Sequence, residues 1–339
     1  MNDAMRASAL YHVSERRVEC REVALAAPGA GEVLIESTCS AISPGTEAMI
    51  FKGAFPKHAA LDAAIGSLAG RFAYPFSYGY ALVGKVSAVG PGVSGDVAGQ
   101  TVFAFHPHQD RTVMPLSDCH RVPDGVASEA ALFLPQVESA LNLVMDGAPL
   151  IGERVLVFGQ GVVGLLTAAL LAEFPLERLV AAEPLAWRRE VAGSWGIEET
   201  VDPTDAGSWQ ALLASLNGAD LLFELSGDMA ALNQAIEAAA FDGRIVVGSW
   251  YGASAHPLDL GGRFHRNRLR LVSSQVSTLN PALTGRWDKR RRIELAWCMV
   301  KKLEPQRLIG QSFSLARCQE AFEAVSARRE GVMQVIFRY

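Results

Sequence analysis

The feature that most constrains the fold of this chain is the stretch from Arg154 to Gly164, RVLVFGQGVVG. A β-type run there leads into Gly159, Gly161 and Gly164, which have GxGxxG spacing. In such a strand-to-helix turn, the first glycine permits the tight turn, the second lets the backbone approach a pyrophosphate, and the third allows close helix packing. The helix N-terminus then presents backbone N–H groups and a positive dipole end to the phosphates. The pattern therefore predicts a dinucleotide phosphate site.

The flanking residues support this prediction. Residues 162–174 form an apolar helical pattern, residues 179–182 a second strand, and Glu183 lies 19 residues beyond Gly164. An acid at this position is typical of a hydrogen bond to the adenosine ribose. A 2′-phosphate about 4 Å from this carboxylate would be repelled by roughly 4 kcal/mol per unit charge at an effective dielectric of 20. The sequence thus favours NAD(H) over NADP(H).

Two basic residues keep the cofactor preference open. Arg188 or Arg189 would offset the repulsion if its side chain turned toward the ribose, although both are compatible with a solvent-facing position. The other cofactor candidates follow predicted strands, at the carboxyl ends where an open parallel sheet binds its ligand. For Trp250 the competing interpretation is an aromatic residue of the core. The predicted cofactor-binding residues are Gly159, Gly161, Val162, Val163, Gly164, Glu183, Arg188, Ser226, Gly227, Ser249, Trp250, Ser274 and Gln275.

The chain changes pattern twice along its 339 residues, which is long enough for two domains. From Val18 to about Asp124, short β-type runs are punctuated by Gly and Pro. Residues 154–273 alternate apolar strands with helices, which predicts a parallel sheet covered on both faces. After about Ser277, two helices and a closing strand are expected. The predicted fold class is α/β, with a doubly wound domain beside a β-rich one.

Charge and hydropathy exclude several classes of function. The net charge of −5 gives no electrostatic reason to bind nucleic acid or anionic lipid. No apolar run approaches a membrane span, and the N-terminus lacks the apolar core of a signal peptide, so a cytoplasmic protein is expected. The basic run Lys289 to Arg292 opens a predicted helix and is interpreted as a solvated face.

The five cysteines are widely scattered, without a CxxC pair or a Cys/His cluster. That distribution favours reduced thiols over a disulfide framework. It also argues against a structural four-cysteine zinc site, which needs closely spaced ligand pairs.

Four ordered motifs carry a resemblance to the medium-chain dehydrogenase/reductase superfamily. They are PGAGEVLIE (28–36), SAISPGTE (40–47), YGYALVGKVSAVGPGV (78–93) and GERVLVFGQGVVG (152–164). The resemblance implies a GroES-like catalytic domain formed by residues 1–126 and 281–339, and a Rossmann dinucleotide-binding domain formed by residues 127–280. It also implies a small-molecule substrate bound in the cleft between them, and a homodimer joined through the edge strand of the cofactor sheet.

The same resemblance bears on zinc. Catalytic zinc ligands of that superfamily are a Cys in the motif resembling SAISPGTE, a His in a GHE motif, and a Cys or acid near the linking helix. The matching positions here are Ser43, Tyr80 and the neighbourhood of Pro135, none of which is a competent ligand. The sequence therefore predicts no metal. Hydrogen-bond donors would have to replace the Lewis acid, and one well-aimed donor contributes about 2.7 to 4 kcal/mol.

Four residues are the catalytic candidates. Tyr80 replaces the ligand histidine and could donate to a carbonyl oxygen; its alternative role is packing against Tyr78. Phe105-His106-Pro107-His108 follows a strand, and the two histidines are expected to point to opposite faces of this extended segment, so that at most one faces the cleft; His106 is favoured. Ser43 and Thr46 lie in the SPGTE motif, where turn formation around Pro44-Gly45 is the competing role.

The favoured function is a zinc-independent, NAD-preferring oxidoreductase acting on an alcohol/carbonyl pair. Reduction of an activated C=C bond, as in quinone and enoyl reductases, and NAD(H) binding without turnover remain alternatives. Partial resemblance extends to the hydroxyethyl-bacteriochlorophyllide dehydrogenase group, in an ISxGTE motif, a GY replacing GH, and an aromatic-Tyr pair after the fifth strand. Tyr80-Ala81 departs from the Tyr-Glu of that group, so its pigment substrate is not carried over.

Overall fold

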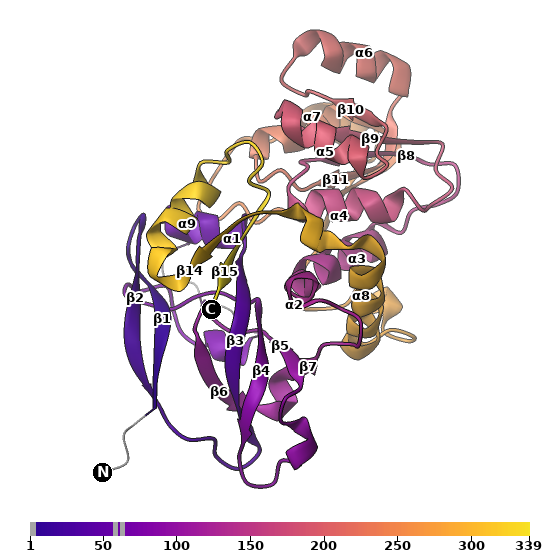
Figure 1. Cartoon of the computed structure of the whole chain (residues 1–339). Helices are drawn as coiled ribbons and strands as arrows, with labels where there is room; N and C mark the ends of the chain where they lie inside the picture. Colours follow the sequence, from indigo (N-terminus) through magenta and orange to yellow (C-terminus); the bar gives the residue numbers. More distant parts are fainter. Residues whose placement is uncertain (1–4, 57–59, 62–64) are drawn as a thin grey trace. The chain divides into compact units, whose positions relative to one another are not determined.

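The computed structural model describes residues 5–56, 60–61 and 65–339. It divides into two compact units, Met1–Pro135 with Val300–Tyr339, and Gln136–Met299. Both boundaries lie later in the chain than the 126/127 and 280/281 expected from the sequence. The second boundary lies inside the helix Lys289–Leu303. Arg292 of this helix is bonded to Glu138, and this contact keeps most of the helix with the second unit. The mixed α/β class, with a β-rich unit and a doubly wound unit, is confirmed (Figure 1).

The second unit contains a parallel sheet ordered β10-β9-β8-β11-β12-β13. The strand order reverses between β8 and β11, so the carboxyl ends of these two strands flank the topological switch point, where such sheets bind ligands. Its strands are β8 (Arg154–Phe158), β9 (Arg178–Ala182), β10 (Glu199–Val201), β11 (Ala219–Glu224), β12 (Ala239–Val247) and β13 (Arg270–Ser273). The helices around it are α3 (Leu134–Gly147), α4 (Val162–Leu171), α5 (Ala186–Ser194), α6 (Ala206–Leu216), α7 (Met229–Ala238) and α8 (Lys289–Leu303).

Helices cover both faces of this sheet, as the apolar strands predict. On one face, Leu222 belongs to a buried cluster with Trp209 of α6 and Leu232 of α7. The neighbouring Phe223 points to the other face, because side chains alternate along a strand. There α3 approaches so closely that a Cβ on Gly147 would lie 2.6 Å from the Phe223 ring.

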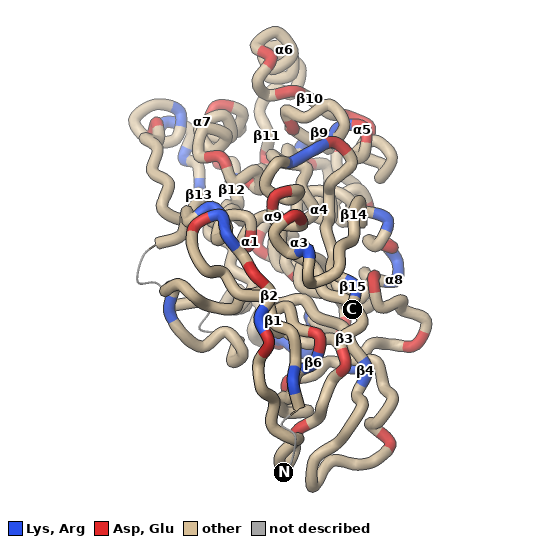
Figure 2. Tube along the Cα trace, turned by 60° about the vertical axis from the view of Figure 1, so that its left-hand side comes forward, with Lys and Arg blue, Asp and Glu red and all other residues tan. Residues whose placement is uncertain are grey.

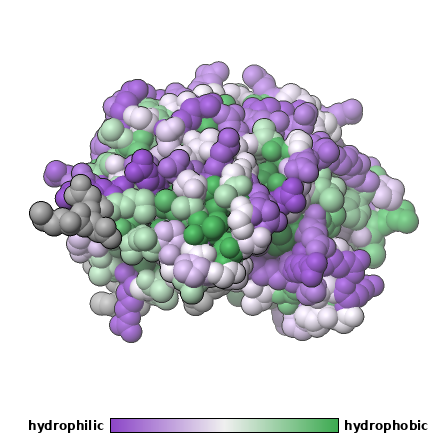
Figure 3. All heavy atoms as spheres, turned by 60° about the horizontal axis from the view of Figure 1, so that its bottom comes forward, coloured by the Kyte–Doolittle hydropathy of each residue, from purple (hydrophilic) through white to green (hydrophobic). Residues whose placement is uncertain are grey.

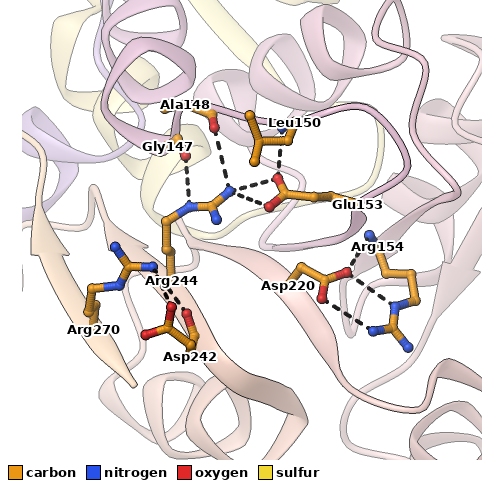
Figure 4. A network of polar contacts seen from close by, with 9 residues as sticks. All are labelled: Gly147, Ala148, Leu150, Glu153, Arg154, Asp220, Asp242, Arg244 and Arg270. Carbon is orange, nitrogen blue, oxygen red and sulfur yellow. Dashed lines mark hydrogen bonds and ion pairs between the residues drawn. The ribbon is translucent and has the colours of Figure 1, made fainter. Parts of the chain in front are cut away.

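Ion pairs hold the amino ends of the strands together (Figure 4). Arg154 at the start of β8 makes two side-chain hydrogen bonds of 3.2 Å to Asp220 of β11. Arg244 of β12 donates to the carbonyl of Gly147 at the end of α3 and pairs with Glu153 at 2.6 Å. This edge is opposite the carboxyl ends, so the network fixes strand register rather than binding a ligand.

The first unit is built around the long strand β3, which pairs antiparallel with β4, β6 and β15. Its sheet order is β14-β15-β3-β4-β5-β7, and β1 and β2 form a separate hairpin. The strands are β1 (Met5–Ser14), β2 (Arg17–Leu25), β3 (Glu32–Ile42), β4 (Leu82–Val89), β5 (Thr101–Ala104), β6 (Arg111–Pro115), β7 (Cys119–Arg121), β14 (Ile309–Ser314) and β15 (Gln334–Arg338). The helices are α1 (Thr46–Phe51), α2 (Ser128–Ala131) and α9 (Cys318–Ser326).

Single-turn helices complete the described chain. They are η1 (Gly66–Leu68), η2 (Gly95–Val97), η3 (Leu116–Asp118), η4 (Leu260–Phe264), η5 (Pro281–Leu283), η6 (Pro305–Leu308) and η7 (Leu315–Arg317). Within the described residues, no helix is long and apolar enough to cross a membrane. Basic and acidic residues are interspersed along the trace in Figure 2, and the face in Figure 3 shows hydrophobic residues among hydrophilic ones.

Candidate functional site

The loop after β8 needs glycine at two positions. Gly159 has φ +84°, and a Cβ there would lie 2.6 Å from the Cα of Ser226, which follows β11. A Cβ on Gly164 would lie 1.9 Å from the carbonyl oxygen of Gly159. The loop therefore packs at the switch point with no room for a Cβ at either glycine, as the fingerprint predicts.

The N-terminus of α4 points out of this loop. Gly161 is its N-cap, Val162 is buried, and Val163 is half-buried. A Cβ on Gly161 would meet, outside its chain neighbours, only the Nη1 of Arg188, at 3.9 Å. The first-turn amides of a helix have no intrahelical acceptor, so this end offers donors and a positive dipole to an anion. These residues fit a dinucleotide pyrophosphate.

Glu183 directly follows β9, beside the loop, and is buried. Its carboxylate accepts hydrogen bonds from the backbone N–H of Gln160 (2.7 Å) and of Leu185 (3.1 Å). One oxygen lies 3.9 Å from Nη1 of Arg188. The charge that favours NAD(H) is therefore present, but a guanidinium stands next to it.

The two arginines that the sequence left open behave differently. Only about a tenth of the Arg188 side chain is exposed, and it faces Glu183. Arg189 instead donates to the carbonyl oxygens of Glu183 and Pro184, and its guanidinium lies 3.4 Å from Asp202. Of the two, Arg188 is the one whose guanidinium lies beside the Glu183 carboxylate.

A buried acid that the sequence analysis did not select organises the turn after β11. Glu224 accepts hydrogen bonds from the backbone N–H of Ser226 (2.8 Å), from its hydroxyl, and from the hydroxyl of Tyr251. Burial and the adjacent Glu224 raise the pKa of Tyr251, which keeps this hydroxyl a donor. The signal in the sequence was an acid at the end of an apolar strand, directly before Ser226-Gly227.

The remaining cofactor candidates divide into two groups. Ser249 lies at the switch-point turn, since its hydroxyl accepts from the N–H of Gly227 at 2.9 Å; Trp250 follows it and is 42% exposed. Ser274 instead accepts from the side-chain amide of Asn142 on α3, and Gln275 accepts from the N–H of Ser277 within its own turn. These last two side chains are engaged in structural contacts.

The basic run at the start of α8 is a solvated face only in part. Arg292 is fully buried and donates to Glu138 (2.8 Å), to Asn142, and to the carbonyl oxygens of Val276 and Thr278. Burial raises the pKa of Glu138, while Arg292 opposes that shift. Because the guanidinium is paired on every side, it fixes the segment after β13 against α3.

In the first unit, the SPGTE motif forms a turn closed by Glu47. Its buried carboxylate accepts the N–H of Ser43 at 2.8 Å, and the Ser43 hydroxyl accepts the N–H of Thr46 at 3.3 Å. Ser43 is buried and Thr46 half-buried. The turn-forming role considered for Ser43 is therefore present in the structure.

The structure brings His108, rather than the favoured His106, to this turn. His108 is fully buried, and its Nε2 lies 2.8 Å from Glu47 Oε2. A Cβ on Gly79 would contact the same imidazole at 3.0 Å, so the YGY segment packs over it. His106 contacts the hydroxyl of Thr112 (2.8 Å), and burial lowers its pKa. The two histidines do point to different surroundings, but the one at the motif is His108.

The packing role considered for Tyr80 is present in the structure. Its ring packs edge-on against Tyr78, with centroids 6.3 Å apart, and joins a cluster with Phe72 and Phe76. It is nevertheless only half-buried.

The donor set does not fit a catalytic zinc. Among the described residues, no three His, Cys, Asp or Glu side chains are grouped to hold a metal ion. At the motif, Glu47 and His108 are bonded to each other, and Ser43 and Tyr80 occupy the positions matching ligands. A catalytic zinc needs three protein ligands.

The family described as zinc-binding dehydrogenase matches residues 162–289, a range that contains none of Ser43, Tyr80 or Pro135. D-guloside 3-dehydrogenase of Escherichia coli K12 is 25% identical over 255 residues, which cover 73% of this chain and 73% of the relative.

Solved structures share the fold over nearly the whole chain. A structure from E. coli CFT073, described as a short chain alcohol dehydrogenase complexed with NADH, has a TM-score of 0.80 at 18% identity and covers 98% of this chain and 99% of its own. A structure from Sinorhizobium meliloti 1021, described as a zinc-binding dehydrogenase bound to NADP, has a TM-score of 0.78 at 18% identity, covering 99% and 100%. At this identity the likeness establishes the fold.

Proposed function

The chain belongs to the medium-chain dehydrogenase/reductase superfamily, and on that premise we propose that it is a zinc-independent oxidoreductase that uses NAD(H) to interconvert an alcohol and a carbonyl compound. Relatives that are dehydrogenases support the oxidoreductase class. The observation that carries the proposal is the glycine cradle at the switch point, where Gly159 and Gly164 leave no space for side chains and the N-terminus of α4 is open.

The residues of this cradle would hold the dinucleotide. Backbone amides from Gly161 to Gly164 would bind the pyrophosphate, and Glu183 would accept from a ribose hydroxyl. Ser226, Gly227 and Ser249 form the turn at the carboxyl ends of β11 and β12. When bound, nicotinamide supplies the hydride acceptor or donor.

NAD(H) is the cofactor that Glu183 favours, and Arg188 moderates that preference. The expected result of titrating the protein with each reduced cofactor, followed by nicotinamide fluorescence, is tighter binding of NADH than of NADPH. Tighter binding of NADPH would show that Arg188 outweighs Glu183.

Side chains would have to polarise the carbonyl oxygen, because the donor set does not fit zinc. Tyr80 is the first candidate donor, and Ser43 and Thr46 lie at the neighbouring motif. One hydrogen-bond donor in a desolvated site contributes about 2.7 to 4 kcal/mol, which is comparable to the several kcal/mol of transition-state stabilisation that a catalytic metal supplies. Metal analysis of the purified protein should find no stoichiometric zinc; about one zinc per chain would overturn this part of the proposal.

Single-turnover mixing of NADH with a panel of ketones and enones separates the enzymatic alternatives. Carbonyl reduction is expected. Turnover of enones alone would favour a C=C reductase, since hydride would then add β to the carbonyl. If NADH binds but its C4 hydrogen never exchanges with any extract-derived substrate, a non-catalytic NAD(H)-binding protein would be favoured.

We also propose a homodimer formed through β13. In the described chain β13 pairs with β12 alone, at the edge of the sheet, and Leu271 on it is 37% exposed. A lysine on an edge strand blocks pairing with another edge. Light scattering should therefore show a dimer for wild type and a monomer for Leu271→Lys. Leu150→Lys, at another exposed leucine, is the control and should leave the dimer intact.

A further inference from the structure

Four polar side chains in the first unit, three of them fully buried, form an unbroken chain of hydrogen bonds. Glu47 Oε2 lies 2.8 Å from His108 Nε2, His108 Nδ1 lies 2.7 Å from the Ser40 hydroxyl, and Ser40 lies 2.8 Å from the hydroxyl of Tyr339. Glu47, His108 and Ser40 are fully buried, whereas Tyr339 is 36% exposed. The chain thus runs from the SPGTE turn to the last residue.

One assignment of donors and acceptors satisfies every contact along this chain. Burial raises the pKa of Tyr339, so its hydroxyl is protonated and can donate to Ser40. With a neutral imidazole, Ser40 donates to His108 Nδ1, and Nε2–H donates to the Glu47 carboxylate. Every member then both gives and receives one hydrogen bond, apart from the two ends. Complete burial also excludes Ser40 as a nucleophile toward a substrate.

We propose that Tyr339, Ser40, His108 and Glu47 form a proton-conducting chain that serves the SPGTE turn. In the carbonyl-reducing direction, Tyr339 passes its proton to Ser40 and takes up another from solvent, Ser40 passes one to Nδ1, and the Nε2 proton moves to Glu47. Glu47 in turn gives it to the alkoxide oxygen that hydride transfer forms on the substrate. One proton enters at Tyr339 and one leaves at Glu47, and alcohol oxidation reverses every transfer.

The role of this hydrogen-bond chain in catalysis rests on the proposed function, because hydride transfer to a carbonyl must be accompanied by one proton. Proton conduction along the four residues does not depend on the proposed function. Tyr339, Ser40 and His108 are conducting groups, and Glu47 is the group that meets the substrate oxygen. A purely structural role makes the opposite prediction for proton exchange, and this allows a direct test.

The test measures solvent exchange of the His108 Nε2 proton by NMR in full-length, ¹⁵N-histidine-labelled protein. Conduction predicts that Ser40→Ala and Tyr339→Phe slow this exchange by at least about tenfold, since a positioned proton-transfer group contributes on the order of a hundredfold to ten-thousandfold. Ser40→Thr, which restores a hydroxyl, should restore the rate. Ser37→Ala is the control, because Ser37 lies on the same strand but donates to the carbonyl of Gln109.

Unchanged or faster exchange in Ser40→Ala and Tyr339→Phe would overturn the proposal, since loosening a structural network exposes the proton. Turnover of the ketone panel then tests the use of the chain. The same two variants should lower kcat and enlarge its solvent deuterium isotope effect without changing KM. If slowed exchange leaves kcat unchanged, the role in the reaction is refuted. If no substrate is turned over, the proposed function fails while the exchange result still decides conduction.

Discussion

Removing the charge of Arg188 should sharpen the preference for NADH over NADPH. Its Nη1 lies 3.9 Å from the Glu183 carboxylate, and at that distance two unit charges interact by about 4 kcal/mol at an effective dielectric of 20. A 2′-phosphate near both groups would recover from Arg188 part of what it loses to Glu183. Without the guanidinium, the repulsion is uncompensated. Because each 1.4 kcal/mol is tenfold, Arg188→Met is expected to weaken NADPH relative to NADH by about tenfold to a thousandfold.

The assay is the ratio of the two dissociation constants, measured by nicotinamide fluorescence at low ionic strength. Glu183→Gln keeps an oxygen for the Gln160 N–H and should shift the ratio the other way. Arg189→Met is the matched control, because that guanidinium serves carbonyl oxygens and Asp202. If Arg188→Met weakened both cofactors equally, or left the ratio unchanged, the electrostatic account of the ribose site would be refuted.

Three further substitutions test packing and charge. Gly164→Ala should weaken NADH binding by about tenfold to a hundredfold in a fluorescence titration, because its Cβ meets the Gly159 carbonyl and overpacking costs about 1–3 kcal/mol. Burial lowers the pKa of His12 to about 3, so between pH 7.5 and 4.5 only the unfolded state takes up a proton at this side chain, and wild type loses about 3 kcal/mol of stability. His12→Phe should abolish this loss, as measured by hydrogen exchange of β1 peptides. Arg292→Met should destabilise the protein by about 3–5 kcal/mol in denaturant unfolding, because Glu138 is left buried and unpaired.

Each of these has an outcome that would contradict it. Gly193→Ala, where a Cβ meets nothing within 4 Å, should bind NADH normally; equal losses in both glycine variants would remove the packing argument. The stability difference between His12→Phe and wild type must grow as pH falls, and a constant difference would show that the imidazole takes up its proton at the same pH in the folded and unfolded states. The double variant Arg292→Met/Glu138→Met should recover part of the free energy of unfolding lost in Arg292→Met. No recovery would show that the two side chains are not energetically coupled.

The sequence predicted those parts of the fold that depend on local pattern. The glycine spacing at Gly159 to Gly164, the alternation of strands and helices, and Glu183 at a strand end all follow from turn chemistry and periodicity. The structure bears out the mixed fold class and the close packing of the loop.

Contacts between segments distant in the chain were beyond such reasoning. Arg292 looked like part of a charged run, although its spacing from the buried Ala296 and Val300 already put it on the inner face of α8. His108 reaches Glu47 only because β3 and the segment after β5 converge, which no local pattern records. The second boundary between the units differs from the predicted one for the same reason, since the long-range contacts of α8 decide to which unit this helix belongs.

The central claim is hydride transfer to a carbonyl without zinc. The most direct measurement follows deuterium from NADH labelled at C4 into a panel of aldehydes and ketones, using protein shown by metal analysis to contain no zinc. The account predicts deuterium on the carbinol carbon of the product. Transfer that appears only after zinc is restored, or that labels only the β carbon of an enone, would contradict it.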